Sequence, residues 1–252
     1  MKISLLVTTR KRIDFLQNMW RTANSTRSPA DVTDANGNLC FEYKHDIELV
    51  LCVDDDDVET RKFYYDHLLA YNTILILGPR PTILGETTNR CFKESTGEIC
   101  MLCTDDVVFH TNGWDDIVVK EFEKYPDKIA LIYGEDGIQH GNTATLPFVH
   151  RNWVKTVGRF LPTHFINEFG DRWLTDVATK VGRRVYLPDL YIQHLHPAHG
   201  GMPYDDTYTY RMNLRRQQKG TRKECIVHYN SLEQERVEEA NKLQNFILNF
   251  KG

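Results

Sequence analysis

The sequence contains no apolar run close to the roughly 20 residues that a membrane-spanning helix needs, so a transmembrane protein is not expected. It also lacks an export signal, because the short apolar start runs directly into the basic residues 10–12. There is no excess of positive charge: 31 Lys and Arg against 35 Asp and Glu give a net charge of −4, which argues against a general nucleic-acid coat. The six cysteines are scattered, as buried thiols in a reducing compartment would be. We therefore expect a cytoplasmic protein, of a bacterium or of a virus-infected host cell.

What the sequence does contain is an ordinary globular composition. Of its 252 residues, 41% are hydrophobic and 26% are charged, which excludes wholesale disorder. It has no internal repeat and no low-complexity tract. A chain of this length forms one large domain, or one domain with a helical appendage.

Short apolar runs alternate with longer amphipathic segments through the first half of the chain. Continuous apolar runs are typical of parallel strands that are buried on both faces. The resulting order, β-α-β-α-β-α-β, predicts an α/β fold with a mainly parallel sheet flanked by helices. The expected strands cover residues 2–8, 47–53, 73–77 and 99–103, the expected helices lie around residues 13–20, 63–69 and 86–95, and residues 25–46 are expected to be a surface insertion.

The second half of the chain is less regular. A loop over residues 199–210, rich in Gly, Tyr and Asp, is suited to covering a site. A capping box of Ser231 and Gln234 predicts the start of a last helix, whose apolar stripe would pack on the body or pair two copies of the chain as a homodimer. Further helices are predicted over residues 114–123 and 171–181, and strands over residues 129–133, 143–149 and 191–196.

Polar side chains gather where the predicted strands end. In doubly wound sheets, ligands bind at the carboxyl ends of the strands, so these side chains are candidates for one common crevice. The alternative is that they are ordinary turn residues, since turns favour Asp. The first strand ends on Thr8, Thr9 and Arg10, the second on Asp54 and Asp55, and the fourth on Thr104, Asp105 and Asp106.

Carboxylates at such a turn suit a hard divalent cation, Mg²⁺ or Mn²⁺, which prefers oxygen ligands and is commonly shared with a phosphate. Asp105 and Asp106 fit a pair that holds the metal of a bound nucleoside diphosphate, where the metal would neutralise charge on a leaving diphosphate. His194 and His196 lie two residues apart in a predicted strand, so both point to one face, and either is able to complete the metal site. The alternative is that they are two ordinary histidines, one packed and one in water.

Five segments of the chain follow one another in an order that matches one enzyme family. Val-Thr-Thr-Arg-Lys-Arg at residues 7–12 stands where that family has Pro-Thr-Tyr-Asn-Arg, and Leu-Cys-Val-Asp-Asp at residues 51–55 is similar to its Val-Asp-Asp. Residues 89–98 are similar to its Ala-Arg-Asn-x-Gly-x-x-x-Ala-x-Gly-Glu helix. Thr-Asp-Asp at residues 104–106 is similar to its metal-binding Asp-x-Asp, and residues 167–174 to the Glu-Asp segment that supplies its general base. Together these segments resemble the GT-A class of nucleotide-sugar-dependent glycosyltransferases, in its inverting, family-2-like branch.

The chain also departs from the family pattern. Thr9 and Arg10 replace the usual Tyr-Asn, Thr88 stands where the base-binding Arg is expected, and Cys91 replaces a Gly. Because a threonine replaces the first carboxylate of Asp-x-Asp, Asp106 is expected to be the principal metal ligand.

The resemblance implies a metal-dependent glycosyltransferase that moves a sugar from a nucleoside-diphosphate sugar, a UDP-sugar foremost, to an acceptor hydroxyl with inversion. It implies a catalytic domain over residues 1–200, with a nucleotide-binding half at 1–104 and a metal and acceptor half at 105–200, and a lid loop and helix over 201–252. Asp171 is expected to be the general base, with Glu168 as the second choice, and Mn²⁺ or Mg²⁺ to be bound by Asp106 with His194 or His196. The donor is expected to contact Thr8, Thr9, Arg10, Arg12, Asp54, Asp55, Asn89, Thr104 and Asp105.

The sequence leaves the acceptor open. A glycan or glycoprotein is the first expectation, because the compact chain suits an enzyme that decorates a soluble polymer. A modified base in viral DNA is the second, because a run of basic residues from Arg211 to Lys223 would suit phosphates. A binding module that has kept the fold without the chemistry, or a hydrolase of nucleotide sugars, are further alternatives.

Overall fold

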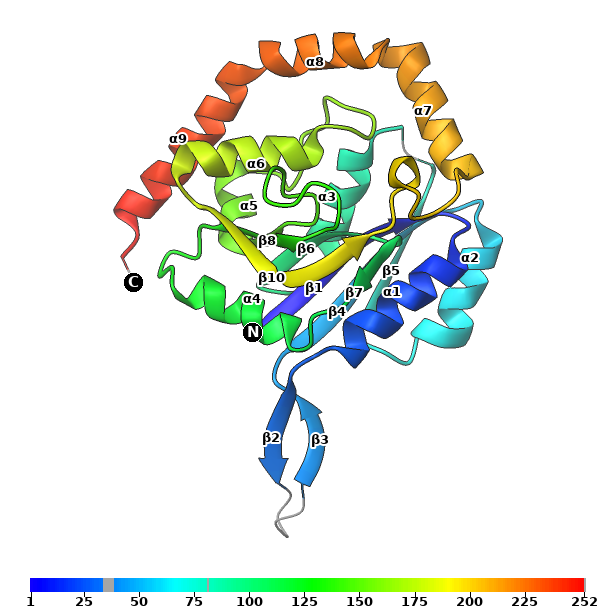
Figure 1. Cartoon of the computed structure of the whole chain (residues 1–252), viewed down its shortest axis with the longest axis vertical. Helices are drawn as coiled ribbons and strands as arrows, with labels where there is room; N and C mark the ends of the chain where they lie inside the picture. Colours follow the sequence, from blue (N-terminus) through cyan, green and yellow to red (C-terminus); the bar gives the residue numbers. More distant parts are fainter. Residues whose placement is uncertain (34–38, 81, 252) are drawn as a thin grey trace.

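The computed structural model describes residues 1–33, 39–80 and 82–251. Within these residues eight strands form one sheet in the order β5-β4-β1-β6-β9-β8-β10-β7, with helices on both faces (Figure 1). Two further strands, β2 (Pro29–Thr33) and β3 (Leu39–Tyr43), form an antiparallel hairpin that projects from the body within the expected surface insertion. The strands of the main sheet are β1 (Lys2–Thr9), β4 (Asp46–Asp54), β5 (Thr73–Gly78), β6 (Ile99–Thr104), β7 (Val107–Phe109), β8 (Leu131–Glu135), β9 (Phe148–His150) and β10 (Arg184–His194).

The first half of the sheet confirms the predicted α/β architecture. β5, β4, β1 and β6 are parallel neighbours, and the side chains of β1 are buried on both faces. In this register Thr8 of β1 lies between Cys52 of β4 and Thr104 of β6. The carboxyl ends of these strands therefore meet at one edge of the sheet.

The second half differs from the sequence-based prediction in two strands. The strand expected over residues 143–149 is only three residues long, because the backbone before it is bound elsewhere: Ala144 N–H donates to the Thr175 hydroxyl and Thr145 N–H to Thr143 O. β9 runs antiparallel to both β6 and β8. The last strand, β10, is longer than expected, with an irregular register between Leu187 and Tyr191, and it ends at His194.

Two apolar cores lie on the two faces of the sheet. One face packs against α1 (Ile13–Ser25), α4 (Trp114–Glu123) and the pair α2 (Val58–Phe63) and η1 (Tyr64–Leu68). The other face packs against α3 (Leu84–Glu94), α5 (Arg151–Val157), α6 (Gly170–Val181) and α9 (Glu233–Asn249). Removal of this apolar surface from water is the main force that stabilises the sheet and fixes its edge. The thiols of Cys52, Cys91, Cys100 and Cys103 are free and buried in this interior, as expected.

The C-terminal part is more helical than the sequence predicted. The expected loop ends at residue 205 and includes the end of the short 3₁₀ turn η2 (Pro197–His199). The helix α7 (Asp206–Lys219) follows, and its N-terminus is capped by the Asp205 carboxylate, which accepts the Tyr208 N–H. The capping box placed at Ser231 and Gln234 is wrong. The box lies at Thr221, with Glu224, and opens α8 (Arg222–Ser231); α9 follows without a side-chain cap. In Figure 1 these helices form an arc from the carboxyl edge of the sheet back to α5 and α6.

α9 is fastened to its own chain. Ala240 and Leu243 of its apolar stripe are buried against the body, and Trp173 Nε1 of α6 donates to Glu239 Oε2 at 2.7 Å. Much of the apolar stripe of α9, expected to pack on the body or to pair two copies of the chain, therefore packs on the body of its own chain. In the part of the chain that the structure describes, no helix combines the length and apolar character that a membrane span requires.

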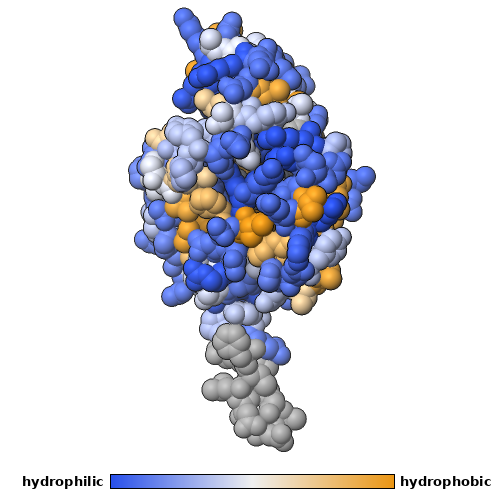
Figure 2. Space-filling view, turned by 90° about the vertical axis from the view of Figure 1, so that its right-hand side faces the viewer, coloured by the Kyte–Doolittle hydropathy of each residue, from blue (hydrophilic) through white to orange (hydrophobic). Residues whose placement is uncertain are grey.

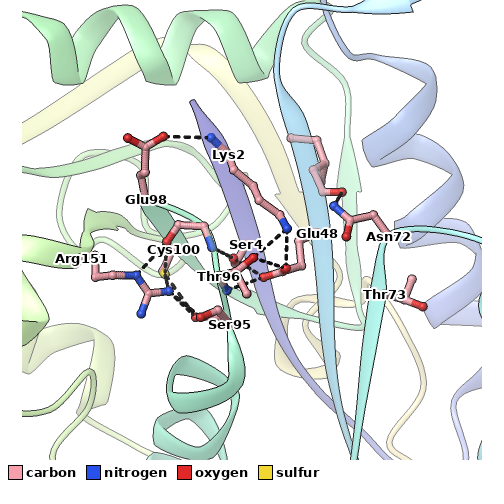
Figure 3. A network of polar contacts seen from close by, with 12 residues as sticks. Lys2, Ser4, Glu48, Asn72, Thr73, Ser95, Thr96, Glu98, Cys100 and Arg151 are labelled. Carbon is pink, nitrogen blue, oxygen red and sulfur yellow. Dashed lines mark hydrogen bonds and ion pairs between the residues drawn. The ribbon is translucent and has the colours of Figure 1, made fainter.

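A buried polar network fixes the edge of the sheet opposite the strand ends (Figure 3). Glu48 of β4 is 1% exposed and accepts hydrogen bonds from Ser4 Oγ at 2.7 Å and from Thr96 N and Oγ1 at 2.8 and 2.6 Å. Lys2 Nζ lies 2.7 Å from Glu48 Oε1. Burial alone would raise the pKa of Glu48, but the hydrogen bonds from Lys2, Thr96 and Ser4 outweigh it and lower the pKa to about 2. The network joins β1, β4 and the turn before β6.

Candidate active site

Two acidic residues form the centre of the carboxyl edge. Asp105 and Asp106 make up the tight turn between β6 and β7, and they are 2% and 6% exposed. Thr9, at the end of the neighbouring β1, donates through Oγ1 to Asp105 Oδ2 at 2.6 Å. Two ionised carboxylates this close and this buried need a cation, because burial penalises their charge.

Arg12, in the loop after β1, supplies such a cation. Its Nη1 lies 3.1 Å from Asp105 Oδ1 and 3.4 Å from Asp106 Oδ2. The other side of the same guanidinium holds Asp205, the residue before α7, through Nε at 2.5 Å and Nη2 at 3.0 Å. Burial and the charge of Asp106 raise the pKa of Asp105, while Arg12 opposes this shift. Arg12 thus connects the acidic turn with α7.

Asp106 and His194 fit a divalent cation. Asp106 Oδ1 is buried and has no hydrogen-bond partner among the described residues, and His194 Nε2 lies 3.5 Å from it. Burial would raise the pKa of Asp106, but the neighbouring His194 and the charge of Arg12 lower it, so the carboxylate is ionised. No group of three His, Cys, Asp or Glu able to hold a metal occurs in the described part of the chain. Mg²⁺ and Mn²⁺ are suited to this arrangement, since Mg²⁺ usually takes one or two protein carboxylates together with substrate phosphates and water.

His196 is used differently from His194. Its Nε2 lies 2.8 Å from the Tyr208 hydroxyl of α7, and its Nδ1 accepts the Ala198 N–H at 3.2 Å. Both ring nitrogens are therefore engaged. The structure brings His194 to Asp106 and directs His196 to α7.

A narrow cleft with several arginines lies beside the acidic turn. Arg10 forms a two-pronged ion pair with Asp56 and also lies 3.0 Å from Asp54 Oδ2. Asp55 is exposed, and its N–H donates to Gly78 O at 2.8 Å, so of the two predicted aspartates only Asp54 faces the cleft. The residues that line the cleft are Thr8, Thr9, Arg10, Cys52, Asp54, Arg80, Thr87, Thr207, Tyr210 and Arg211.

α7 forms one wall of this cleft. The guanidinium of Arg80 stacks on the Tyr210 ring, 3.5 Å from its centroid, and Thr207 Oγ1 donates to Arg10 O at 3.3 Å. Arg211 also lines the cleft, and none of the described residues accepts a hydrogen bond from it or forms an ion pair with it. Burial lowers the pKa of Arg211, and the charges of Asp105 and Asp54 oppose this shift without forming an ion pair with it. A guanidinium in that condition is suited to a phosphate.

The predicted bases lie at the start of α6. Asp171 is in the first turn of this helix, where the helix dipole favours a carboxylate, and its Oδ1 accepts the Arg172 N–H at 2.8 Å. Burial raises the pKa of Asp171, and the charge of Asp136 adds to that effect while His194 opposes it. Glu168 forms an ion pair with Arg215 of α7, and its Oε2 is buried without a partner among the described residues.

Asn89 of α3 lies in a structural contact. Its Nδ2 donates to Leu161 O at 2.9 Å, and its Oδ1 accepts the N–H groups of Phe160 and Leu161 at 2.9 and 3.0 Å. All of these bonds go to one loop, so the Asn89 amide fastens α3 to it.

Three residues at this edge did not stand out in the sequence. Asp136 follows β8 directly, and its position between a strand and Gly137 is a signal of the same kind as Asp54. Asp205 sits three residues before Tyr208, the spacing of a helix cap. No sequence pattern around Arg80 indicates that it lies in the cleft.

Comparison with known proteins is informative for the fold. No protein-family model and no curated protein sequence matches the chain. Among solved structures, the mannosyltransferase PcManGT from Pyrobaculum calidifontis, in complex with GDP-Man and Mn²⁺, superposes with a TM-score of 0.63 at 12% identity, over 97% of this chain and 69% of that one. TarS residues 1–349 from S. aureus, in complex with UDP-GlcNAc, superposes with a TM-score of 0.56 at 15% identity, over 85% and 65%. The chain therefore has a GT-A-like glycosyltransferase fold.

Proposed function

We propose that this chain is a metal-dependent glycosyltransferase that moves a sugar from a nucleoside-diphosphate sugar to an acceptor hydroxyl with inversion, and that a UDP-sugar is the preferred donor. The observation that carries the proposal is that a cleft suited to a diphosphate and a site suited to a divalent cation lie next to each other. The unpaired Arg211 lines a basic cleft, and the buried Asp106 and His194 offer a cation site at the same strand edge. A nucleoside diphosphate with its metal has the charges to fill both.

The donor is proposed to lie along the carboxyl edge. Asp54 faces the nucleobase, Arg10 and Arg211 face the diphosphate, and Asp106 with His194 hold Mn²⁺ or Mg²⁺, which neutralises charge on the leaving diphosphate. The Mn²⁺ bound in the mannosyltransferase supports this choice of metal. Thr8 and Thr9 line the cleft and are proposed to contact the donor, as are Thr104 and Asp105 at the end of β6. In this assignment residues 1–104 form the donor half, residues 105–200 the metal and acceptor half, and α7 covers the donor.

Asp171 is proposed to be the general base. The acceptor oxygen attacks the anomeric carbon, its proton passes to the Asp171 carboxylate, and the diphosphate leaves from the opposite face of the sugar. Burial makes this carboxylate a stronger base than an exposed aspartate. Glu168 is the second choice, because its carboxylate is already engaged in an ion pair with Arg215 of α7.

A glycan or a glycoprotein is proposed as the acceptor. The basic run that would suit DNA is divided in the structure: Arg215 is buried and paired with Glu168, and Arg211 lines the cleft. Arg216, Arg222 and Lys223 remain exposed. This division favours a donor contact for Arg211 and leaves modified DNA as the second candidate.

A thermal-shift panel with UDP, UDP-N-acetylglucosamine, GDP and GDP-mannose, each with and without Mn²⁺, tests the donor site. A ligand that binds only the native state raises its melting temperature, and we expect a shift with one nucleotide that depends on the metal. No shift with any nucleotide would contradict the proposal. Release of free sugar at a full catalytic rate without an acceptor would instead indicate a hydrolase, and binding without turnover on any acceptor a binding module.

A further inference from the structure

Asp136 is a buried carboxylate at the end of β8 whose two oxygens differ. It is 3% exposed. Oδ1 accepts the backbone N–H groups of Ile138, Gln139 and His140 at 2.8, 2.7 and 3.2 Å. Oδ2 is buried and has no hydrogen-bond partner among the residues that the structure describes. Three backbone donors hold the carboxylate in one orientation, and its second oxygen is left without a partner.

The position of Asp136 connects the metal ligand with the base. Its backbone oxygen accepts the His194 N–H at 3.0 Å, so the two strand ends lie side by side. The charge of Asp136 also acts on Asp171 at the start of α6, so its carboxylate lies within electrostatic range of the proposed base. Asp136 therefore borders the space between His194 and Asp171.

In the proposed reaction, the space between His194 and Asp171 is occupied by the sugar of the donor. A direct displacement requires the anomeric carbon to lie between the attacking oxygen, at Asp171, and the leaving diphosphate, at the metal held by Asp106 and His194. A side chain that lies near both Asp171 and the metal ligands is therefore placed beside the ring of the transferred sugar.

Resting on the proposed function, we infer that Asp136 Oδ2 binds a hydroxyl of the transferred sugar and selects a neutral sugar over an anionic one such as a uronic acid. A carboxylate accepts hydrogen bonds from sugar hydroxyls and has no proton to offer a second carboxylate. Asp106, Asp136 and Asp171 place three carboxylates around the space. Arg12 and His194 do not offset them, because Arg12 already faces Asp105, Asp106 and Asp205, and His194 faces Asp106.

Asp136→Asn isolates the free oxygen. The amide keeps a carbonyl oxygen that accepts the same three backbone N–H groups, so the turn is retained while Oδ2 becomes a donor. Glu135→Gln is the matched control. It is the adjacent carboxylate on the same strand, but its oxygens bind His140 Nδ1 at 2.8 Å and the Tyr186 hydroxyl at 2.7 Å.

Isothermal titration with Mn²⁺ present and with UDP, UDP-glucose, UDP-N-acetylglucosamine and UDP-glucuronic acid measures the effect without an acceptor. GDP and GDP-mannose replace the uridine series if the wild type binds only GDP. We expect the wild-type protein to bind a neutral sugar nucleotide about tenfold more tightly than the free nucleotide, and Asp136→Asn to lose that gain while its affinity for the free nucleotide stays unchanged. UDP-glucuronic acid is expected to bind the wild type more weakly than the neutral donors, and the variant to narrow this difference.

The outcomes separate the inference from the proposed function. Equal weakening of the free nucleotide and the sugar nucleotide by Asp136→Asn would show a structural role and overturn the inference. So would an unchanged sugar preference in the variant, or a wild-type preference for the glucuronic acid donor. If no nucleotide binds the wild type, the proposed function fails and the inference fails with it.

Discussion

Arg12 and Asp205 form a two-pronged ion pair, with Nε 2.5 Å from Oδ2 and Nη2 3.0 Å from Oδ1. The pair joins the loop after β1 to the residue that caps α7, across almost the whole length of the chain. Figure 1 shows α7 over the end of the sheet where these loops lie. The face of the molecule in Figure 2, on which α7 and α2 lie, is largely hydrophilic with separate apolar spots. α7 is therefore held to the sheet by polar contacts of the kind that a charged ligand is able to replace.

Asp205→Asn is expected to loosen α7. The substitution removes the charge that pairs with Arg12 and should cost about 1–2 kcal/mol of local stability, so the amides of α7 exchange roughly tenfold faster. Hydrogen exchange with mass spectrometry measures this. Asp206→Asn is the matched control, because Asp206 is exposed and next in the chain. Equal exchange in both variants would contradict the role of the ion pair.

His194→Ala is expected to weaken metal binding, whereas His196→Ala is expected to loosen α7. His194 faces Asp106, so its loss is expected to weaken Mn²⁺ binding about tenfold or more. His196 contacts Tyr208 instead, so its loss should leave Mn²⁺ affinity unchanged and speed amide exchange in α7. Electron paramagnetic resonance of bound Mn²⁺ measures the first effect. Equal Mn²⁺ loss in both variants would place both histidines at the metal.

Arg211→Gln is expected to weaken nucleotide binding without weakening the fold. Arg211 makes no hydrogen bond or ion pair with the described residues, so its removal breaks no such contact, and the burial of its charge, which lowers its pKa, is relieved. We expect about a tenfold loss of affinity for the nucleoside diphosphate and an unchanged or higher melting temperature. Arg216→Gln, an exposed substitution on the same helix, should change neither. A lower melting temperature with unchanged nucleotide affinity would give Arg211 a structural role.

Asp171→Asn is expected to lower transfer 10²- to 10⁴-fold, by order of magnitude, and to spare donor binding. In the wild type, the rate should rise with pH as Asp171 loses its proton, because only the ionised form accepts the acceptor proton. Burial raises the pKa of Asp171, so the midpoint of this acid limb should lie above that of an ordinary aspartate. A pH–rate profile and the anomeric configuration of the product check both points; a retained configuration would exclude direct displacement.

Glu48 makes the fold sensitive to acid. Its pKa is about 2 in the folded protein, below the 4.5 of a free glutamate, so its ionised form stabilises the native state above about pH 4.5. That stabilisation, up to about 3 kcal/mol, is lost as the pH falls toward 2. Denaturant unfolding between pH 2 and 7 should show this slope in the wild type and a weaker one in Glu48→Gln. Equal slopes would mean that other carboxylates dominate.

The sequence predicts the parallel half of the sheet well because its strands are apolar on both faces. The approach of Asp106 and His194 also follows from the sequence, since both stand at strand ends of one edge. α7 could not be predicted in full, because its first turns are rich in Tyr and Thr and directly follow a loop-like segment that contains Gly200, Gly201 and Pro203. The use of Asn89 depends on a loop about 70 residues away, at residues 160–161, which no local pattern reports.

β9 is the junction between two blocks of the sheet. Its three residues pair with β6 on one side and β8 on the other, and Phe148 and Val149 are fully buried. Asp54 ends β4 in one block, and Asp136 directly follows β8 in the other. Asp105 and Asp106 connect β6 of the first block to β7, which pairs with β10 in the second. The spacing between Asp54 and Asp136 therefore depends on β9, which carries neither, whereas Asp106 is held beside His194 by the pairing of Val107 with His194 and by the hydrogen bond from Leu195 N–H to Asp106 O at 2.8 Å. Substitutions of Phe148 or Val149 would therefore shift the nucleotide end of the site, at Asp54, relative to Asp136, although neither side chain belongs to the site.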